Sequence, residues 1–298
     1  MFISVVVPTY NRAKKLVRCL STLSEQRFRD YEIIVVDDGS SDDTPVVVRN
    51  FHDVVYIRQN NRGPAAARNL GLAHAHGEVV AFTDDDCVAP LDWLAQLESG
   101  YLRHPEVAGV GGHMEPPAEI LRSNIFARYE WHSTRNTIGI NRQEFVGGFE
   151  CPAGGTNNMS YRRQALIEVG GFDESFPFAA GEDADLKWRI CQREHHLLYI
   201  PVRVTHLHEY TWQSFRRQHV TRGKGAARFE EKWAQRPSRA RILARLSWRF
   251  VIFWKDLATI ETKSNAMLKL AAGVFDCLGQ LQIRPTGGRS CSRPLGKG

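Results

Sequence analysis

The stretch Val79-Val80-Ala81-Phe82-Thr83-Asp84-Asp85-Asp86 joins a short apolar run directly to three consecutive carboxylates. The β-branched and aromatic residues of 79–82 predict a buried strand. Three unpaired negative charges are not tolerated at the end of such a strand, so a positive partner is expected there. Alternate residues of an extended segment point the same way, and Asp84 and Asp86 are therefore predicted to converge on one divalent cation while Asp85 faces elsewhere. In isolation an Asp triplet is more commonly a solvated turn, so the neighbouring motifs have to decide.

Three further apolar runs end in polar residues in the same way. Strands are predicted at 3–7, 32–36 and 54–57, and they run into Pro8-Thr9-Tyr10-Asn11-Arg12, Asp37-Asp38-Gly39-Ser40-Ser41-Asp42 and Asn60-Asn61-Arg62-Gly63-Pro64. Helical spacing of apolar residues follows the first run, and Pro64 suits the first turn of a helix. Apolar strands separated by helices predict an α/β fold, with a mostly parallel, Rossmann-like sheet flanked by helices. Ligands of such sheets bind beyond the carboxyl ends of the strands, which is where these acids fall.

The 298-residue chain has an ordinary globular composition, with 43% hydrophobic and 24% charged residues. This argues against a disordered chain and against a polytopic membrane protein. The formal net charge of +6 is unevenly distributed, because 21 Lys/Arg against 28 Asp/Glu give −7 up to residue 209 and 18 against 5 give +13 beyond it. The basic C-terminal tail predicts an acidic partner, either an anionic membrane or a nucleic acid.

Cysteine usage and the N-terminus both indicate a cytoplasmic protein. The six cysteines show no paired CxxC spacing, so neither a zinc site nor a disulfide framework is predicted. A strand is predicted within three residues of the N-terminus, which leaves no room for the basic region, apolar region and cleavage site of a secretory signal.

The second half of the chain is less regular. Residues 112–150 show few periodic signals, and we interpret them as a region that shapes the substrate site. The run Gly181-Glu182-Asp183-Ala184-Asp185 predicts the start of a helix. Taken alone, its acid pair is as consistent with a plain helix N-terminus as with a functional site.

Five motifs together resemble the family 2 glycosyltransferases in order and spacing. They are Pro8-Thr9-Tyr10-Asn11-Arg12, Val36-Asp37-Asp38-Gly39-Ser40, Thr83-Asp84-Asp85-Asp86, Gly170-Gly171-Phe172-Asp173 and Gly181-Glu182-Asp183. The family consists of inverting enzymes of the GT-A fold. The resemblance implies a transferase domain over 1–225, with a nucleotide-binding half at 1–112 and an acceptor-binding half at 113–225. Each motif alone is weak, but five in order make the solvated-turn interpretation of the Asp triplet a minority one.

The resemblance also implies donor-binding residues. The segment Pro8-Thr9-Tyr10, with Arg12 in the same motif, and Asp38 resemble the residues that hold the nucleobase and ribose of the donor. Arg68, in the segment Ala67-Arg68-Asn69, resembles a further contact on the nucleotide side.

The Asp triplet resembles the DxD motif of the family, where Mn²⁺ or Mg²⁺ bridges the pyrophosphate. Asp84 and Asp86 match the outer acids, and Asp85 takes the variable middle place on the donor side. Some members use adjacent acids, so the pair that holds the ion stays open. Such a dication would stabilise the charge of the leaving nucleoside diphosphate as a Lewis acid.

Asp183 matches the family's general base, with Glu182 beside it on the acceptor side. A positioned base that removes the proton of an acceptor hydroxyl contributes ~10²–10⁴-fold in rate. A single in-line displacement inverts the anomeric centre, so no covalent nucleophile is needed. Gly154 and Gly155 resemble a wall of the acceptor or donor-sugar site, although a plain turn is almost as consistent with them.

Two features beyond residue 200 refine this hypothesis. His206 and His208 follow an apolar stretch at 197–204, and we favour His208 as an imidazole near the metal. Gln218-His219-Val220-Thr221-Arg222-Gly223 departs from the Gln-x-x-Arg-Trp motif of processive members, because Arg222 comes one residue late and no Trp follows. The departure favours transfer of a single sugar over polysaccharide synthesis.

The predicted tail, 226–283, is basic and amphipathic. Arg241, Arg245 and Arg249 recur at four-residue spacing, and another stripe carries Leu243, Leu246, Phe250, Phe253 and Leu257, with Trp248 and Trp254 nearby. Its apolar run is shorter than the ~20 residues that span a bilayer, so we expect a peripheral helix on the anionic inner face of the membrane. The alternatives are packing on the catalytic domain and formation of a homodimer. Residues 284–298 are expected to be disordered.

We therefore expect an inverting, metal-dependent transferase that moves one sugar from a nucleotide-diphospho-sugar, UDP-sugar first, to a saccharide or lipid-linked acceptor in cell-surface glycan biosynthesis. A nucleic-acid partner is not expected. A nucleotidyltransferase is the first alternative, but no Gly-rich, Lys-bearing loop follows the first strand to hold a triphosphate. The second is a non-catalytic sugar-nucleotide-binding protein, in which a lost base or metal acid would be expected.

Overall fold

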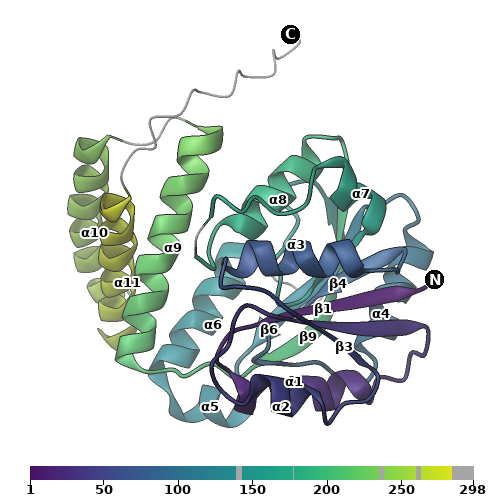
Figure 1. Cartoon of the computed structure of the whole chain (residues 1–298). Helices are drawn as coiled ribbons and strands as arrows, with labels where there is room; N and C mark the ends of the chain where they lie inside the picture. The colour runs from purple at the N-terminus through teal and green to yellow at the C-terminus, as the bar shows by residue number, and fades with distance from the viewer. Residues whose placement is uncertain (139–142, 177, 235–237, 260–262, 284–298) are drawn as a thin grey trace. The chain divides into compact units, whose positions relative to one another are not determined.

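The computed structural model describes residues 1–138, 143–176, 178–234, 238–259 and 263–283. The chain divides into two units: Met1–Pro177 with Glu182–Glu209, and Phe178–Gly181 with Tyr210–Gly298. The first is an α/β unit and the second is helical (Figure 1). The segment 284–298, expected to be disordered, lies outside the described residues.

The first unit contains all of the described strands and eight of the named helices. The strands are β1 (Ile3–Thr9), β2 (Tyr31–Asp37), β3 (Val54–Arg58), β4 (Val79–Phe82), β5 (Cys87–Val88), β6 (Gly109–Glu115), β7 (Phe145–Gly147), β8 (Met159–Arg162) and β9 (Leu197–His206). The helices are α1 (Ala13–Ser24), α2 (Thr44–Val48), α3 (Pro64–His74), α4 (Trp93–Arg103), α5 (Ala118–Ser123), α6 (Ile125–Ile138), α7 (Arg163–Glu168) and α8 (Glu182–Cys191), while α9 (Trp212–Trp233) begins the second unit.

One sheet of nine strands runs through the first unit in the order β3-β2-β1-β4-β8-β6-β9-β5, with β7 also paired to β9. Strands β1 to β4 are parallel, and β6 is parallel to β9. Strand β8 lies antiparallel between β4 and β6, and the short β5 and β7 are antiparallel to β9. The predicted α/β architecture with a mostly parallel sheet is confirmed.

The sheet has an apolar core on each face because its strands alternate their side chains with a period of two. Val5 and Val7 of β1 join the core beneath α1 and α4, whereas Val6 joins the core beneath α3, α7 and α8. Figure 1 shows α1 and α2 on one side of the sheet and α3, α7 and α8 on the other. Residues 112–150, which gave few periodic signals, hold the end of β6 together with α5, α6 and β7.

The register between β1 and β4 creates the edge at which polar residues gather. Of the residues of β1, only Ile3–Val6 pair with β4, so the last residues of β1 pair with β2 alone. Pro8, which has no N–H to donate, falls in this part of β1. The chain after Phe82 is thereby free to turn beside Thr9.

Helix α3 lies close to the sheet because its contact face carries small residues. A Cβ added at Gly71 would lie 2.4 Å from Cγ1 of Val6, a distance that real Cβ atoms do not adopt. Ala65, Ala66 and Ala67 are likewise buried. This close packing brings Arg68, in the second turn of α3, to the carboxyl ends of the strands.

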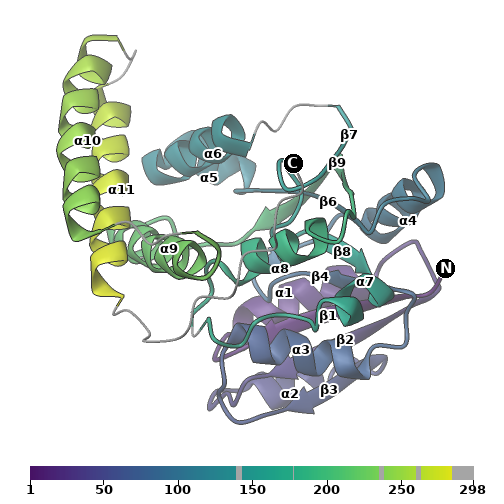
Figure 2. The same ribbon diagram turned by 90° about the horizontal axis from the view of Figure 1, so that it is seen from above.

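The second unit contains three long helices, α9, α10 (Arg239–Thr259) and α11 (Lys263–Gln282), and α11 packs against both others (Figures 1 and 2). A Cβ added at Gly279 would lie 2.0 Å from the carbonyl oxygen of Val220, so α9 and α11 are in close contact. His219 Nδ1 lies 3.0 Å from Asp276 Oδ1 across the same pair. Helix α9 runs without a break through position 225, where the sequence placed the end of the transferase domain. None of the described helices is long and apolar enough to cross a membrane.

The buried side chain of Asn158 links three elements of the first unit. Its Nδ2 donates to the carbonyl oxygens of His113 (2.8 Å) and Val202 (3.0 Å), and its Oδ1 accepts from Trp93 Nε1 at 2.9 Å. Strands β6 and β9 and helix α4 therefore meet at one hydrogen-bonded amide, which lies directly before β8. Polar groups this deeply buried are expensive to leave without partners.

We predict that Asn158→Ala lowers the free energy of unfolding by about 3 kcal/mol, because it leaves the indole N–H of Trp93 and two carbonyl oxygens in the core without their hydrogen-bond partner. Urea denaturation of the purified chain measures this. Asn157→Ala is the matched control, since the Asn157 side chain has a weaker hydrogen bond, from its amide nitrogen to the sulfur of Met114 at 3.1 Å. Equal losses in the two variants would contradict the assignment.

Candidate active site

The three acids that follow β4 lie in a turn. Strand β4 ends at Phe82, and the N–H of Cys87 donates to the carbonyl oxygen of Asp84 at 3.0 Å. The expectation of an extended segment with strict alternation is therefore wrong, because a hydrogen-bonded turn decides the directions of these side chains. Asp85 and Asp86 are buried, while the side chain of Asp84 is 29% exposed.

Basic side chains from the start of α1 neutralise two of these acids. Arg12 Nη1 donates to Asp85 Oδ1 at 3.0 Å and to Asp86 Oδ2 at 3.1 Å, and Lys15 Nζ lies 3.5 Å from Asp86 Oδ2. The hydroxyl of Thr9 donates to Asp85 Oδ2 at 2.7 Å. Asp85 is thus held by residues of the β1–α1 connection.

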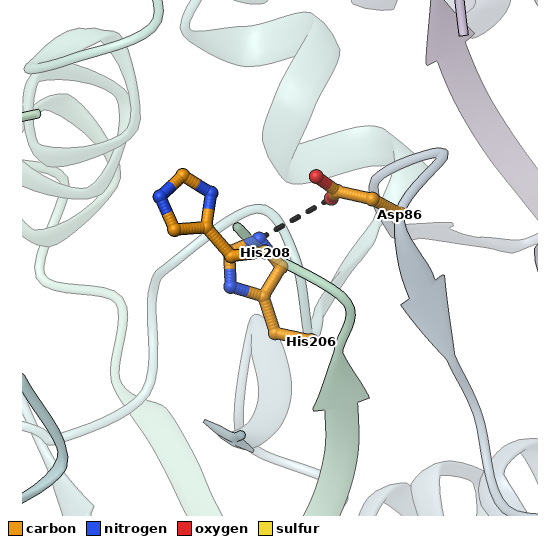
Figure 3. Close-up of side chains that lie close together, drawn as sticks. All are labelled: Asp86, His206 and His208. Carbon is orange, nitrogen blue, oxygen red and sulfur yellow. Dashed lines mark ion pairs between the residues drawn. The ribbon is translucent and has the colours of Figure 1, made fainter. Parts of the chain in front are cut away.

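Asp86 also faces the end of β9. His206 Nε2 lies 3.3 Å from Asp86 Oδ1, and the His206 and His208 rings stack with centroids 5.3 Å apart (Figure 3). One ligand atom from each of Asp86, His206 and His208 lies within 4.8 Å of the others, and the same holds for Asp84, Asp86 and Cys87. Asp86 belongs to both groups, which makes it the central candidate ligand.

The ionisation of these groups suits cation binding. Burial favours the neutral acid at Asp86, but the hydrogen bond and charge of His206, with Arg12 and Lys15, lower its pKa well below the ordinary value. Burial raises the pKa of Asp85 to about 6, against the opposing charge of Arg12. Burial, and then the neighbouring His206, lower the pKa of His208 to about 4, so its imidazole is neutral at pH 7 and has a lone pair for a metal.

A buried arginine links the Asp triplet to helix α8. Arg68 Nη2 donates to Asp84 Oδ1 and Arg68 Nη1 donates to Glu182 Oε1, both at 2.9 Å. Its guanidinium also lies over the ring of Phe172, 5.7 Å from the centroid. The sequence predicted a nucleotide contact for Arg68, and in this structure both of its terminal nitrogens are bonded to protein carboxylates.

Glu182 and Asp183 open α8, where the helix dipole favours negative charge. Burial, with the charge of Asp183, nevertheless raises the pKa of Glu182 to about 7, opposed by Arg68. Burial also raises the pKa of Asp183, although its Oδ1 accepts the N–H of Ala184 at 2.8 Å. A carboxylate with a raised pKa is a stronger base than an ordinary aspartate.

The acids after β2 organise loops of the same edge. Asp38 accepts three hydrogen bonds, from Gln59 Nε2 at 2.7 Å, the N–H of Arg62 at 2.8 Å and the N–H of Gly63 at 2.9 Å. Asp37 accepts from the hydroxyl of Tyr56 at 2.6 Å and the N–H of Ser40 at 2.7 Å. Tyr10, in the neighbouring loop, is 47% exposed and open to a ligand.

The loop with Gly154 and Gly155 lies next to the end of β4, because the hydroxyl of Thr83 donates to the carbonyl oxygen of Asn157 at 3.0 Å. Gly154 has φ of 140°, and a Cβ there would lie 2.8 Å from Cδ of Lys187 on α8. Glycine is therefore required at 154, and the loop runs directly against α8.

The structure brings together most of the residues that the sequence singled out. Thr9, Arg12 and Asp84–Asp86 meet at the ends of β1 and β4, and Arg68 connects them to Glu182. Sequence reasoning did not foresee Lys15 or the direct contact of His206 with Asp86. The adjacency of β1 and β4 in a parallel sheet is the signal that would have found Lys15, since residues just after β1 must lie beside those after β4.

Comparison with solved structures identifies the class of fold. A mannosyltransferase of Pyrobaculum calidifontis, PcManGT, solved with GDP-Man and Mn²⁺, matches with a TM-score of 0.63 and 20% identity, over 94% of this chain and 87% of that one. GalNAc-T7, solved with UDP, GalNAc and Mn²⁺, matches with a TM-score of 0.59 and 17% identity, over 84% of this chain and 51% of that one. The fold is that of the GT-A glycosyltransferases.

The chain belongs to glycosyl transferase family 2, because the sequence model of that family matches residues 4–170. The sequence model of a second family, glycosyltransferase like family 2, matches residues 114–232. The resemblance seen in the sequence motifs is thereby confirmed, and the protein is a glycosyltransferase by family.

The curated relatives are glycosyltransferases as well. The pre-mycofactocin glycosyltransferase of Mycobacterium tuberculosis is 35% identical over 67% of this chain and 41% of its own length. The validoxylamine A glucosyltransferase of Streptomyces hygroscopicus is 31% identical over 63% of this chain and 51% of its own length. The chain thus spans about half or less of the length of these two relatives.

We predict that Arg68→Met lowers the free energy of unfolding by about 3–5 kcal/mol at pH 8, because two carboxylates lose their buried cation. The folded-state pKa of Glu182 lies above its ordinary value, so its contribution to stability is lost as the pH rises through about 7. The gap between the variant and the parent should therefore shrink at pH 5.5, where Glu182 is protonated. Denaturant unfolding at both pH values measures it.

Arg62→Met provides the control. Arg62 pairs with Glu174 at 2.7 Å, but the two side chains are 63% and 37% exposed. Removing such a surface pair costs about 0.5 kcal/mol or less. A pH-independent loss in the Arg68 variant would contradict the electrostatic account.

Proposed function

We propose that this protein is an inverting, metal-dependent glycosyltransferase, which moves one sugar from a nucleotide-diphospho-sugar to a hydroxyl of a saccharide or lipid-linked acceptor. The observation that carries the proposal is the bridge from Asp84 through Arg68 to Glu182. It ties an acid-rich candidate cation site to a helix start that presents a second carboxylate, Asp183. A transfer of this type needs these two features close together: a place for the diphosphate and a base for the acceptor.

The donor atoms at the sheet edge fit a divalent cation. Asp86 is held ionised, and His206 and His208 bring imidazole nitrogens within 4.8 Å. A mixed carboxylate and imidazole set departs from the all-oxygen ligation that Mg²⁺ prefers, so we propose Mn²⁺ ahead of Mg²⁺. When bound, the cation would offset the negative charge that develops on the leaving diphosphate.

The cationic side chains around the triplet have a second role in this proposal. Arg12 is half exposed and Lys15 is 29% exposed, so both can turn from Asp86 toward a diphosphate. Guanidinium and ammonium groups are the usual partners of phosphate oxygens. In the absence of the donor, the same groups compensate the charges of Asp85 and Asp86.

Asp183 is proposed as the base that removes the proton of the acceptor hydroxyl. Its raised pKa strengthens it for this step, and its position in the first turn of α8 keeps an ionised form accessible. Glu182 is committed to Arg68, so of the pair Asp183 is the one that is not tied to a guanidinium. The oxygen then attacks the anomeric carbon as the bond to the diphosphate breaks, which inverts that centre.

A UDP-sugar is the donor we propose to test first, and a GDP-sugar is the second donor to compare with it. Tyr10 offers an exposed ring, and Asp38 lies in the loop at the end of β2, where the nucleoside is proposed to bind. The loop at Gly154 and Gly155, together with Glu182, is proposed to border the acceptor.

We predict that Asp183→Asn reduces kcat by at least about 10³-fold while leaving the Kd for the nucleotide-sugar within about threefold, because only the proton transfer is lost. Release of nucleoside diphosphate measures turnover, and calorimetry measures donor binding. Glu168→Gln, an exposed carboxylate at the end of α7, is the control and should behave as the parent. Unchanged turnover in the Asn variant would remove Asp183 from the role of base.

We predict that Asp86→Asn weakens Mn²⁺ binding by at least about 100-fold and His206→Ala by about tenfold, because each removes a candidate ligand from the group around Asp86. Loss of the free Mn²⁺ signal in electron paramagnetic resonance measures binding without turnover. Asp92→Asn, at the N-cap of α4, leaves that group untouched and serves as the control. Parent-like Mn²⁺ binding in the Asp86 variant would place the ion elsewhere.

A further inference from the structure

Helix α10 of the second unit has an inner face that packs on α11. Ile242 is 1% exposed, and Leu246, Arg249 and Phe253 follow it at helical spacing with partial burial. A Cβ added at Gly273 of α11 would lie 2.8 Å from Cδ of Arg249, so this arginine lies against α11. Arg249, the third arginine of the predicted basic stripe, therefore packs on α11 within the second unit.

The opposite face of α10 is apolar and open. Trp248 is 61% exposed, Val251 56%, Leu243 52% and Phe250 48%. At 100° per residue these side chains, with Ala240 and Ala244, occupy one broad arc opposite Ile242, and the only polar side chain in this arc among residues 239–253, Ser247, donates its hydroxyl to the carbonyl oxygen of Leu243. We call this set the outer face of α10.

This arrangement divides the apolar stripe that the sequence predicted. Leu246 and Phe253 lie on the inner side, whereas Leu243 and Phe250 lie on the outer face. The side chains of Trp254 and Leu257, which the same prediction included, lie outside the described residues. Four large apolar side chains in 15 residues are far more than a solvated helix face normally exposes.

Arginines border the outer face of α10 on both sides. On the helical projection, exposed Arg239 lies at one edge, and exposed Arg241 and Arg245 lie at the other. Arg245 Nη1 makes a long 3.4 Å contact to Glu230. An apolar face between cationic edges is typical of helices that lie in a membrane interface.

We propose that the outer face of α10 docks on an anionic lipid surface, with Trp248, Phe250, Leu243 and Val251 entering the interface and the flanking arginines meeting acidic headgroups. The helix lies in the plane of the surface, since none of the described helices can cross a membrane. A Trp at this position suits the boundary between headgroups and acyl chains.

Charge favours lipid over a second copy of the chain. Residues 210–298 carry 18 Lys/Arg against 5 Asp/Glu, a balance of +13. Joining two such units through their outer faces would bring arginine-edged surfaces together, and like charges repel. An anionic lipid surface supplies both an apolar layer and the opposite charge, each basic residue near it being attracted.

The test is flotation of the full-length chain with phosphatidylcholine vesicles that contain or lack 30% phosphatidylglycerol, at low and high salt. The parent should bind only the anionic vesicles, and binding should weaken as salt screens the arginines. The double variant Trp248→Ser/Phe250→Ser should lower the partition coefficient about tenfold or more, because both substitutions remove exposed apolar area. This inference is independent of the proposed catalytic roles, since no turnover is measured.

Two matched controls isolate the outer face. Leu102→Ser/Ile167→Ser removes apolar side chains that are 71% and 49% exposed in the first unit, and should bind as the parent. Arg241→Gln/Arg245→Gln should reduce binding, whereas Arg216→Gln/Arg217→Gln, with the same change of charge on exposed positions of α9, should reduce it less. The two charge pairs also keep the test decisive if the apolar double variant unfolds.

Equal partitioning of the parent and both α10 double variants would overturn the proposal. So would a parent that ignores anionic vesicles and is dimeric in light scattering, with the Trp248/Phe250 variant monomeric, because the occupant would then be a second copy. Quenching of the parent's tryptophan fluorescence by brominated lipids, and its reduction in Trp248→Phe, would support insertion of Trp248 itself.

Discussion

The buried guanidinium of Arg68 is the interaction on which the acid-rich end of the sheet depends. It is bonded to Asp84, just after β4, and to Glu182, the first residue of α8, two positions 98 residues apart in the chain. Breaking one side of a buried ion pair leaves an uncompensated charge in a poorly solvated place. The small residues of α3 are part of the same constraint, because only a helix that lies this close to β1 can deliver Arg68 to both carboxylates.

Compensation of charge explains much of the remaining geometry. Asp85 and Asp86 are buried beside Arg12, Lys15 and His206, and these partners come from the start of α1 and the end of β9. The three acids consequently differ in character although they are adjacent in sequence. Asp84 is held by Arg68, Asp85 is closed off by Thr9 and Arg12, and Asp86 faces both histidines. Position within the turn, rather than residue type, separates their roles.

The sequence was sufficient for strands β1 to β4 and for the edge where the site forms, because β-branched runs and the topology of parallel sheets are local and general signals. It was not sufficient for the turn at 84–87, which depends on one backbone hydrogen bond. Nor did it reveal Lys15, since a lysine in the first turn of a helix normally faces solvent. The contact of His206 with Asp86 requires β5 to pair with β9, and a two-residue strand has no pattern to recognise.

For helix α10, too, the sequence alone could not predict which side chains are buried. Its apolar residues surround most of the helix, so periodicity alone cannot decide which of them pack and which remain open; only the contact with α11 does so. Once Ile242 is fixed inward, Trp248 and Val251 must point outward, because an α-helix turns by 100° per residue. The uneven distribution of charge along the chain then indicates which kind of surface the outer face of α10 contacts. Residues up to 209 carry −7 and those beyond carry +13, so an anionic surface attracts the helical unit and repels the α/β unit. Electrostatics therefore favours docking of the proposed lipid surface on the helical unit rather than on the acidic α/β unit.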